Sequence, residues 1–349
     1  MNALKVVFLA VALGIALLVA LSRERTIFPT PIQRVQSTRQ PAVEIIALGK
    51  IGFALGDVAI LNSGRIWAVG YDGHDPRRFF YSGDWGRTWE IKPVNSSGFL
   101  LEDIAFADAE HGWAVGGYGT ILRTTDGGST WEQMKSPSLA KLDEIRFFNA
   151  QIGYATGSKA LWYKETDTYA WGVVALCTAD GGVTWRKCYE DDSSHSLGGI
   201  VPLSEKVAVG SLDDHIIRTA DGGLTWQVAS EVVDYGPAFR HPDGTVWGSR
   251  SDGALFRSLD QGKTWQSFGH LPPFDIEANR VAWSGLAFAD ERRGIAVGHH
   301  GHLALTRDGG LTWTNLNMGI NEDLRSVWLK GNQGLILGSE NVYQIRVPD

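Results

Sequence analysis

Apolar and polar residues alternate along this chain in many short runs, and apolar stripes with the period of a helix are absent. The runs are separated by clusters rich in glycine, aspartate, serine and threonine, which are typical of turns. In the clearest stretch, we expect strands at 103–107, 112–116, 120–125 and 130–134. This pattern predicts an all-β protein of short antiparallel strands.

One turn motif recurs along the chain, with Ser or Thr, Asp, Gly and Thr-Trp at fixed offsets, as in Thr-Thr-Asp-Gly-Gly-Ser-Thr-Trp at 124–131. We expect the carboxylate to accept backbone N–H bonds while the glycines supply positive φ, which makes the aspartates structural. A calcium loop would need alternating carboxylates and a distal glutamate, which the motif lacks. The six aspartates are Asp84, Asp126, Asp180, Asp221, Asp260 and Asp308.

A repeat of about 40 to 45 residues with turn residues at fixed offsets is typical of propeller blades of four strands. Six units carry the motif, and a seventh offers only three strands, at 326–329, 334–338 and 342–347. Residues 43–48 precede the first unit and can supply the missing strand, which closes the ring and removes exposed edges. The sequence therefore predicts a seven-bladed propeller over residues 42–349, with six blades and frayed ends as the alternative.

The N-terminal residues 1–25 form a separate segment, in which Lys5 precedes an uncharged apolar run from Val6 to Leu21. Its length allows a cleaved export signal or a retained membrane anchor. We expect one apolar helix that anchors the chain in a membrane, with the propeller in the periplasm or lumen. Cleavage would leave a secreted or periplasmic protein instead. Residues 26–41, with three prolines, are typical of a linker.

The net charge of the 349 residues is −7 and no run of Lys or Arg occurs, which disfavours a nucleic-acid partner. Cys177 and Cys188 flank one Asp turn and are plausible cross-strand neighbours. In an oxidising compartment they can form a disulfide. The alternative is two separate small apolar residues.

In a blade of four strands, the Asp turns join the third strand to the fourth, so all of them lie on one face of the disc. Recognition residues concentrate on variable loops of a rigid frame, and we therefore expect a protein partner on the opposite face. Connections of this face carry aromatic, basic and acidic residues. The candidates are Tyr71, His74, Arg77, Arg78, Tyr118, Tyr169, Trp171, Asp213, His215, Arg250, His299 and His300.

The segment His299-His300-Gly301-His302 could suggest a metal, because imidazole is a common metal ligand. It aligns, however, with Gly117–Thr120, an ordinary hairpin turn of another blade. We therefore expect solvated turn histidines, no metal and no cofactor.

The motif Ser/Thr-x-Asp-x-Gly-x-Thr-Trp resembles the Asp-box, or bacterial neuraminidase repeat, of sialidases and several non-catalytic propellers. Sialidases also carry a Phe/Tyr-Arg-Ile-Pro segment, which Arg65-Ile66-Trp67 does not match. The fuller unit at 111–131 is similar to the repeat of photosystem II assembly and stability factors and their bacterial relatives. This resemblance implies a lumenal or periplasmic seven-bladed propeller without catalytic activity that serves membrane-protein assembly.

The leading hypothesis is a membrane-anchored, non-enzymatic scaffold that binds a protein partner, with a membrane protein under assembly as the candidate. The alternative is a glycan-acting hydrolase of sialidase type, or a carbohydrate-binding module, with its site on the same face. Two carboxylates at a defined separation would be needed for glycan hydrolysis.

Overall fold

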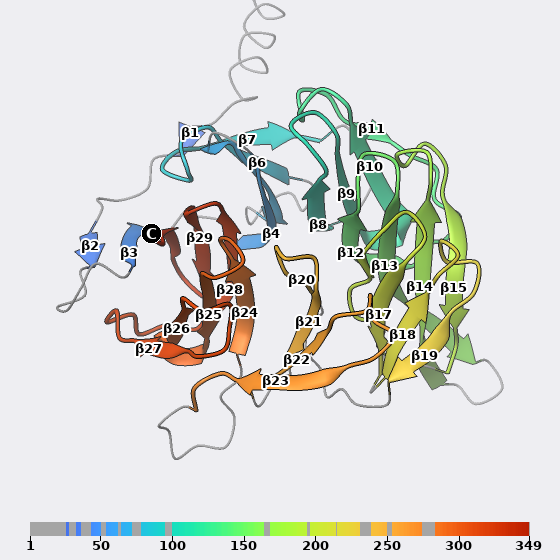
Figure 1. The fold of residues 1–349 in the computed structure, drawn as a ribbon. Coiled ribbons are helices and arrows are strands. Elements are labelled where there is room, and N and C mark those ends of the chain that lie inside the picture. Colours follow the sequence, from blue (N-terminus) through green and yellow to red (C-terminus); the bar gives the residue numbers. More distant parts are fainter. Residues whose placement is uncertain are drawn as a thin grey trace, which may run out of the picture.

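The protein was analysed as a computed structural model. The structure describes residues 26–27, 33–35, 43–49, 54–61, 64–71, 78–94, 100–163, 168–193, 196–213, 215–230, 239–249, 253–273 and 283–348. Seven antiparallel sheets are arranged around an axis (Figure 1), and the first strand of each blade lies on the inside, where the first strands of most neighbouring blades contact one another. The predicted seven-bladed all-β propeller is confirmed.

The first three blades follow the expected order of strands from the axis outward. Blade 1 contains β4 (Ala54–Ile60), β5 (Ile66–Tyr71), β6 (Arg78–Ser82) and β7 (Trp89–Pro93). Blade 2 contains β8 (Leu101–Phe106), β9 (Gly112–Gly116), β10 (Thr120–Thr124) and β11 (Glu132–Gln133). Blade 3 contains β12 (Lys141–Phe147), β13 (Gly153–Tyr163), β14 (Thr168–Thr178) and β15 (Arg186–Asp191).

The next three blades repeat this order. Blade 4 contains β16 (Val201–Pro202), β17 (Ala208–Leu212), β18 (His215–Thr219) and β19 (Gln227–Ser230). Blade 5 contains β20 (Phe239–Arg240), β21 (Val246–Ser249), β22 (Ala254–Ser258) and β23 (Gln266–His270). Blade 6 contains β24 (Trp283–Phe288), β25 (Gly294–Gly298), β26 (Leu303–Thr306) and β27 (Thr314–Leu316).

Blade 7 is completed by the N-terminal part of the chain, as predicted. Its own strands are β28 (Leu324–Lys330), β29 (Gln333–Gly338) and β30 (Val342–Arg346), and β3 (Glu44–Gly49) pairs antiparallel with β30. Because the first and last blades share this segment, the ring is closed without a covalent link. Two further short strands cover outer edges: β2 (Gln33–Val35) pairs with β3, and β1 (Thr26–Ile27) pairs with β7.

Strands β1 and β2 lie in the segment predicted as a linker, whereas the apolar helix predicted for residues 1–25 lies outside the described residues. Among the described residues, no helix has the length and apolar character needed to cross a membrane. The division of the chain at residues 25 and 41 stays a prediction.

The hydrophobic core consists of layers between neighbouring blades. Strands near the axis are apolar on both faces, as in Ile66–Val69 and Trp113–Val115, which are almost fully buried. Each sheet packs against two neighbours, so both faces of a middle strand lose contact with water. This explains why the sequence shows short apolar runs there.

The Asp turns are held by side-chain hydrogen bonds within each motif. Asp126 accepts the Thr130 N–H at 2.9 Å and the Thr130 hydroxyl at 2.6 Å, and Thr124 donates its hydroxyl to Asp126 at 2.8 Å. The Thr124 oxygen in turn accepts the N–H of Gly128 at 2.9 Å. The same set of bonds recurs in the turns of Asp84, Asp180, Asp221, Asp260 and Asp308.

Candidate functional site

Carboxylates at the axis link neighbouring inner strands. Asp57, Asp103 and Glu144 occupy the same bulge position in β4, β8 and β12. The Trp328 indole N–H of blade 7 donates to Asp57 at 3.2 Å. On the other side of blade 3, the Glu144 carboxylate lies so close to Gly199 of blade 4 that a Cβ there would be 1.9 Å from Oε2. Each carboxylate therefore takes part in a contact between blades.

The central member of this row is Asp103, which is almost fully buried. It accepts the N–H of Ile104 at 2.8 Å, the N–H of Ile145 at 2.7 Å and the guanidinium of Arg146 at 2.5 Å. Burial raises the pKa of Asp57 well above 3.8, and the neighbouring Asp103 carboxylate raises it further. These roles are structural, and the sequence pattern did not single these residues out.

The face opposite the Asp turns is built from the connections between second and third strands. In blades 2 and 6 these connections are the short 3₁₀ turns η2 (Gly117–Gly119) and η3 (His299–Gly301). Tyr118 and His300 occupy the same left-handed position, with φ of 55° and 54°. The histidine segment therefore adopts the same turn as Gly117–Gly119, as the sequence alignment predicted.

His299 and His300 lie beside Asp323, which the sequence reasoning missed. The His300 N–H donates to Asp323 at 2.8 Å, and Nδ1 of His299 is 3.7 Å from the other carboxylate oxygen. The His300 N–H and the nearby imidazoles lower the pKa of Asp323. Within the described residues, no three His, Cys, Asp or Glu side chains are grouped so that they could hold a metal ion.

Other predicted partner-binding residues are spread over this face. Tyr71 ends β5 with 43% of its surface exposed, and Arg78 begins β6 in a half-buried position. Asp213 exchanges backbone and carboxylate hydrogen bonds with Ser196, each of 2.9 Å, next to the half-buried His215. His74, Arg77 and Arg250 lie outside the described residues, and Tyr169 is described only as part of a strand.

The most distinctive feature of this face is a long hairpin in blade 3. Blade 2 turns back after Gly116, whereas β13 and β14 stay paired as far as Tyr163 and Thr168. We call the paired segments 159–163 and 168–172 the arm, which is roughly 17 Å long at 3.4 Å per residue. Trp171 lies on the arm with 55% of its surface exposed.

The arm has two uncovered edges. In the described part of the chain, β12 pairs with β13 only as far as Ser158, and β15 pairs with β14 only as far as Val173. Among the described strands, the arm segments pair only with each other. At the base, Lys159 forms ion pairs of 2.6 Å with Glu190 and Asp192, which fix the hairpin to the blade.

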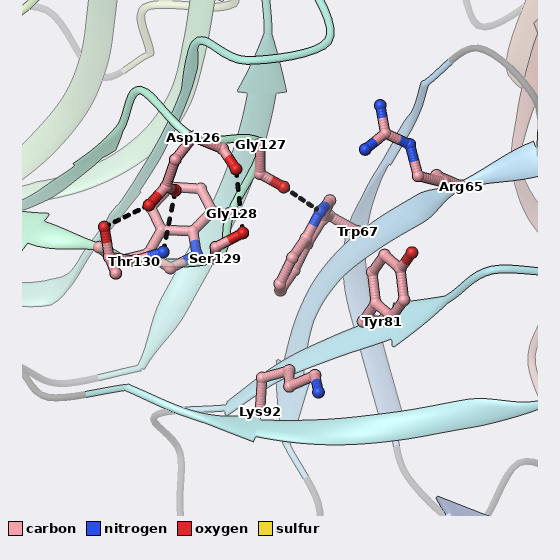
Figure 2. Close-up of a pocket in the computed structure, with 10 residues that line it drawn as sticks. Arg65, Trp67, Tyr81, Lys92, Asp126, Gly127, Gly128, Ser129 and Thr130 are labelled. Atoms are coloured by element: carbon pink, nitrogen blue, oxygen red, sulfur yellow. Dashed lines mark hydrogen bonds between the residues drawn. The ribbon is translucent and has the colours of Figure 1, made fainter.

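On the side of the Asp turns, a groove lies between blades 1 and 2 (Figure 2). It has a volume of about 650 Å³. Blade 1 contributes basic and aromatic side chains, and blade 2 contributes an Asp turn and its tryptophan. The lining residues are Arg65, Trp67, Tyr81, Lys92 and residues 126–131. We call this the 1–2 groove, and the sequence reasoning missed it because it assigned the whole Asp-turn face to the scaffold.

Cys177 and Cys188 form a disulfide in blade 3, with a Cα–Cα distance of 5.8 Å. The disulfide packs against Gly223 of the next Asp turn, where a Cβ would be 2.8 Å from Sγ of Cys177. A structural disulfide is typical of exported proteins and of oxidising compartments.

The closed ring and its six bonded Asp turns define a class, the seven-bladed Asp-box β-propellers. The family described as photosynthesis system II assembly factor YCF48 matches residues 93–192. The chloroplastic photosystem II stability/assembly factor HCF136 of Arabidopsis thaliana is 35% identical over 286 residues, covering 64% of this chain and 69% of that protein. The chain belongs to this photosystem II stability/assembly factor family.

A further relative and a solved structure are also similar to this chain. The photosystem II assembly lipoprotein Ycf48 of Prochlorococcus marinus (strain MIT 9313) is 27% identical over 194 residues, which cover 53% of this chain and 53% of that protein. The match thus spans about half the length of that relative. A solved structure described as YCF48 bound to D1 peptide has a TM-score of 0.64 and 20% identity, and covers 90% of this chain and all of that chain.

Proposed function

We propose that this protein is a non-catalytic assembly factor that binds a membrane protein during the assembly of photosystem II. The observation that carries the proposal is the 35% identity to the Arabidopsis stability/assembly factor. A relative of the same fold is described as bound to D1 peptide, which supports an extended segment of that protein as the ligand. The relatives are assembly factors and give no support to the glycan-acting alternative.

We further propose that the propeller acts on the lumenal or periplasmic side of the membrane. The disulfide between Cys177 and Cys188 supports an oxidising compartment. The apolar segment from Val6 to Leu21 supports an attachment to the membrane on which the client is assembled.

For the client-binding site, we propose the face opposite the Asp turns, with the arm as its main contact. An uncovered strand edge is a template for an extended peptide, because its free N–H and C=O groups can pair with a further strand. The exposed Trp171 adds apolar contact area beside these edges. Elsewhere the chain covers edges by the same means, since β1 and β2 add to β7 and β3.

The arm can be removed with little disturbance of the blade, because blade 2 shows a short turn at the same place. In this arm-less variant, residues 158–173 are replaced by Gly-Tyr-Gly, the turn that follows Gly116. Full-length protein in detergent is titrated with a labelled D1 peptide, and hydrogen exchange is recorded with and without peptide. We expect binding that protects amides of 159–163 or 168–172, and at least tenfold weaker binding by the arm-less variant.

Unchanged affinity of a folded arm-less variant would refute the site while leaving the function in place. Absence of any D1-peptide binding by the native protein would refute the function itself. The variant Trp171→Ala, with Leu139→Ala as the control at another exposed apolar residue, tests the side-chain contribution.

A further inference from the structure

The 1–2 groove lies at a blade interface that lacks an arginine found at two other interfaces. The residue just before the first Ser or Thr of the motif is Arg123 in blade 2 and Arg218 in blade 4. Nε of Arg123 donates to the Gly181 carbonyl of the next Asp turn at 2.7 Å, and Nε of Arg218 donates to the Gln261 carbonyl at 2.8 Å. Blade 1 has Tyr81 in this place.

The Gly181 and Gly127 carbonyls, at equivalent positions of two Asp turns, differ in the hydrogen bonds that they accept. Gly181 accepts both Arg123 and the Trp113 indole N–H, which lies at 2.9 Å. The corresponding Gly127 carbonyl accepts the Trp67 indole N–H at 3.1 Å, and among the described residues no bond from Tyr81 to this carbonyl replaces that of the arginine. The space that a guanidinium fills between blades 2 and 3 is therefore open between blades 1 and 2.

Basic groups lie at both ends of this space. Figure 2 shows Arg65 beside the Asp turn and Lys92 at the other end, with Trp67 and Tyr81 between them. Within the described part of the chain, the Arg65 guanidinium has no hydrogen-bond or ion-pair partner. Lys92 pairs with Glu90 at 2.7 Å.

The acidic residue of the groove does not offset these charges for a ligand, because its oxygens are engaged. Both carboxylate oxygens of Asp126 accept bonds from Thr130, and one also accepts the Thr124 hydroxyl. The space that remains open thus carries positive charge and aromatic walls. By charge complementarity it suits an anionic group attached to an apolar chain.

The backbone donors of the Asp turn favour a carboxylate over a phosphate as the ligand, because they are already used. Phosphate sites use several free backbone N–H groups. In the Asp turn, the N–H of Gly128 donates to Thr124 and the N–H of Thr130 donates to Asp126. The N–H of Gly127 donates to the Glu110 carbonyl at 2.9 Å, so these backbone donors are already used. The planar guanidinium of Arg65 can pair with the two oxygens of a carboxylate without any backbone donor.

We propose that the 1–2 groove is a second peptide-binding site, which takes the carboxylate of an acidic side chain flanked by apolar residues. Arg65 binds the carboxylate, Lys92 adds positive charge, and Tyr81 and Trp67 contact the apolar neighbours. Its volume of about 650 Å³ fits such a side chain and its flanks better than a free inorganic anion. The site lies on the side of the Asp turns and goes beyond the proposed client contact at the arm.

The test uses full-length protein and a short labelled peptide with one glutamate between phenylalanine and leucine, amidated at its C-terminus. A twin peptide with glutamine in place of glutamate is the matched ligand. We expect the glutamate peptide to bind at least tenfold more tightly, as measured by fluorescence anisotropy, and to weaken with added salt. Equal binding of the twins, or no binding of either, would overturn the proposal.

Three substitutions locate the binding. Arg65→Gln should lower the affinity about tenfold, whereas Arg87→Gln, on the neighbouring Asp turn but outside the groove, should leave it unchanged. Tyr81→Arg introduces the arginine that blades 2 and 4 carry at this position and fills the groove, so it should abolish binding although it adds a positive charge. Non-specific attraction would instead make Tyr81→Arg bind more tightly, and that result would refute the site.

Two controls separate other outcomes. Inorganic phosphate that displaces the peptide at lower concentration than acetate would assign the groove to phosphate and overturn the inference. Binding of D1 peptide at the arm should not change in Tyr81→Arg, so failure at the groove and failure of the proposed function are distinguishable. Thermal unfolding of each variant shows that a loss of binding is not a loss of fold.

Discussion

The bond network of Asp103 gives a sharp prediction about how the blades are held together. Asp103→Ala removes the acceptor for the N–H groups of Ile104 and Ile145 and the partner of Arg146. A buried N–H left without an acceptor costs about 1–3 kcal/mol. The Arg146 side chain keeps 45% of its surface accessible, so water partly replaces the lost ion pair. We therefore expect a loss of about 3–5 kcal/mol in the free energy of unfolding.

Urea unfolding followed by tryptophan fluorescence measures this loss, with the slope m checked to ensure that the same transition is compared. Glu102→Ala is the matched control, because Glu102 adjoins Asp103 in β8 and pairs with the half-exposed Lys141 at 3.2 Å. Such a surface pair contributes less than about 1 kcal/mol. If Asp103→Ala costs no more than Glu102→Ala, the inner carboxylates do not join the blades as described.

Two further predictions concern the same interfaces. Because burial and the Asp103 carboxylate raise the pKa of Asp57, the stability that its protonation provides is complete below pH 3.8 and is lost as pH rises toward the folded-state pKa. In Asp57→Asn the amide oxygen can still accept the Trp328 N–H. This variant should raise the melting temperature at pH 7 and leave it unchanged at pH 3. An equal change at both pH values would disprove the raised pKa of Asp57. Gly128→Ala should destabilise the protein by about 2–4 kcal/mol, because φ is +90° and a Cβ would be 2.3 Å from the Trp67 ring. Gly244→Ala, with φ of +88° and nothing within 4 Å of the new Cβ, reports the backbone strain alone, so equal melting temperatures of the two variants would exclude the clash.

The repeat itself determined the fold. A turn motif whose Asp, Gly and Thr recur at fixed offsets specifies a local structure with its own hydrogen bonds, as in Thr124 to Thr130. Short continuous apolar runs between such turns specify strands with two buried faces. The closing strand at 43–48 could be predicted from the number of strands in each unit. The last unit has three strands instead of four, and residues 43–48 precede the first unit and belong to none.

The tertiary structure alone decided what happens between blades. Asp57, Asp103 and Glu144 recur at about the repeat length, but the sequence does not show that the bulges of three inner strands bring them into one row at the axis. The 1–2 groove likewise depends on a difference between two interfaces, where Tyr81 replaces an arginine whose partner is a carbonyl of another blade. A sequence pattern reports local hydrogen bonds and burial, whereas contacts across blades depend on how far each side chain reaches into its neighbour.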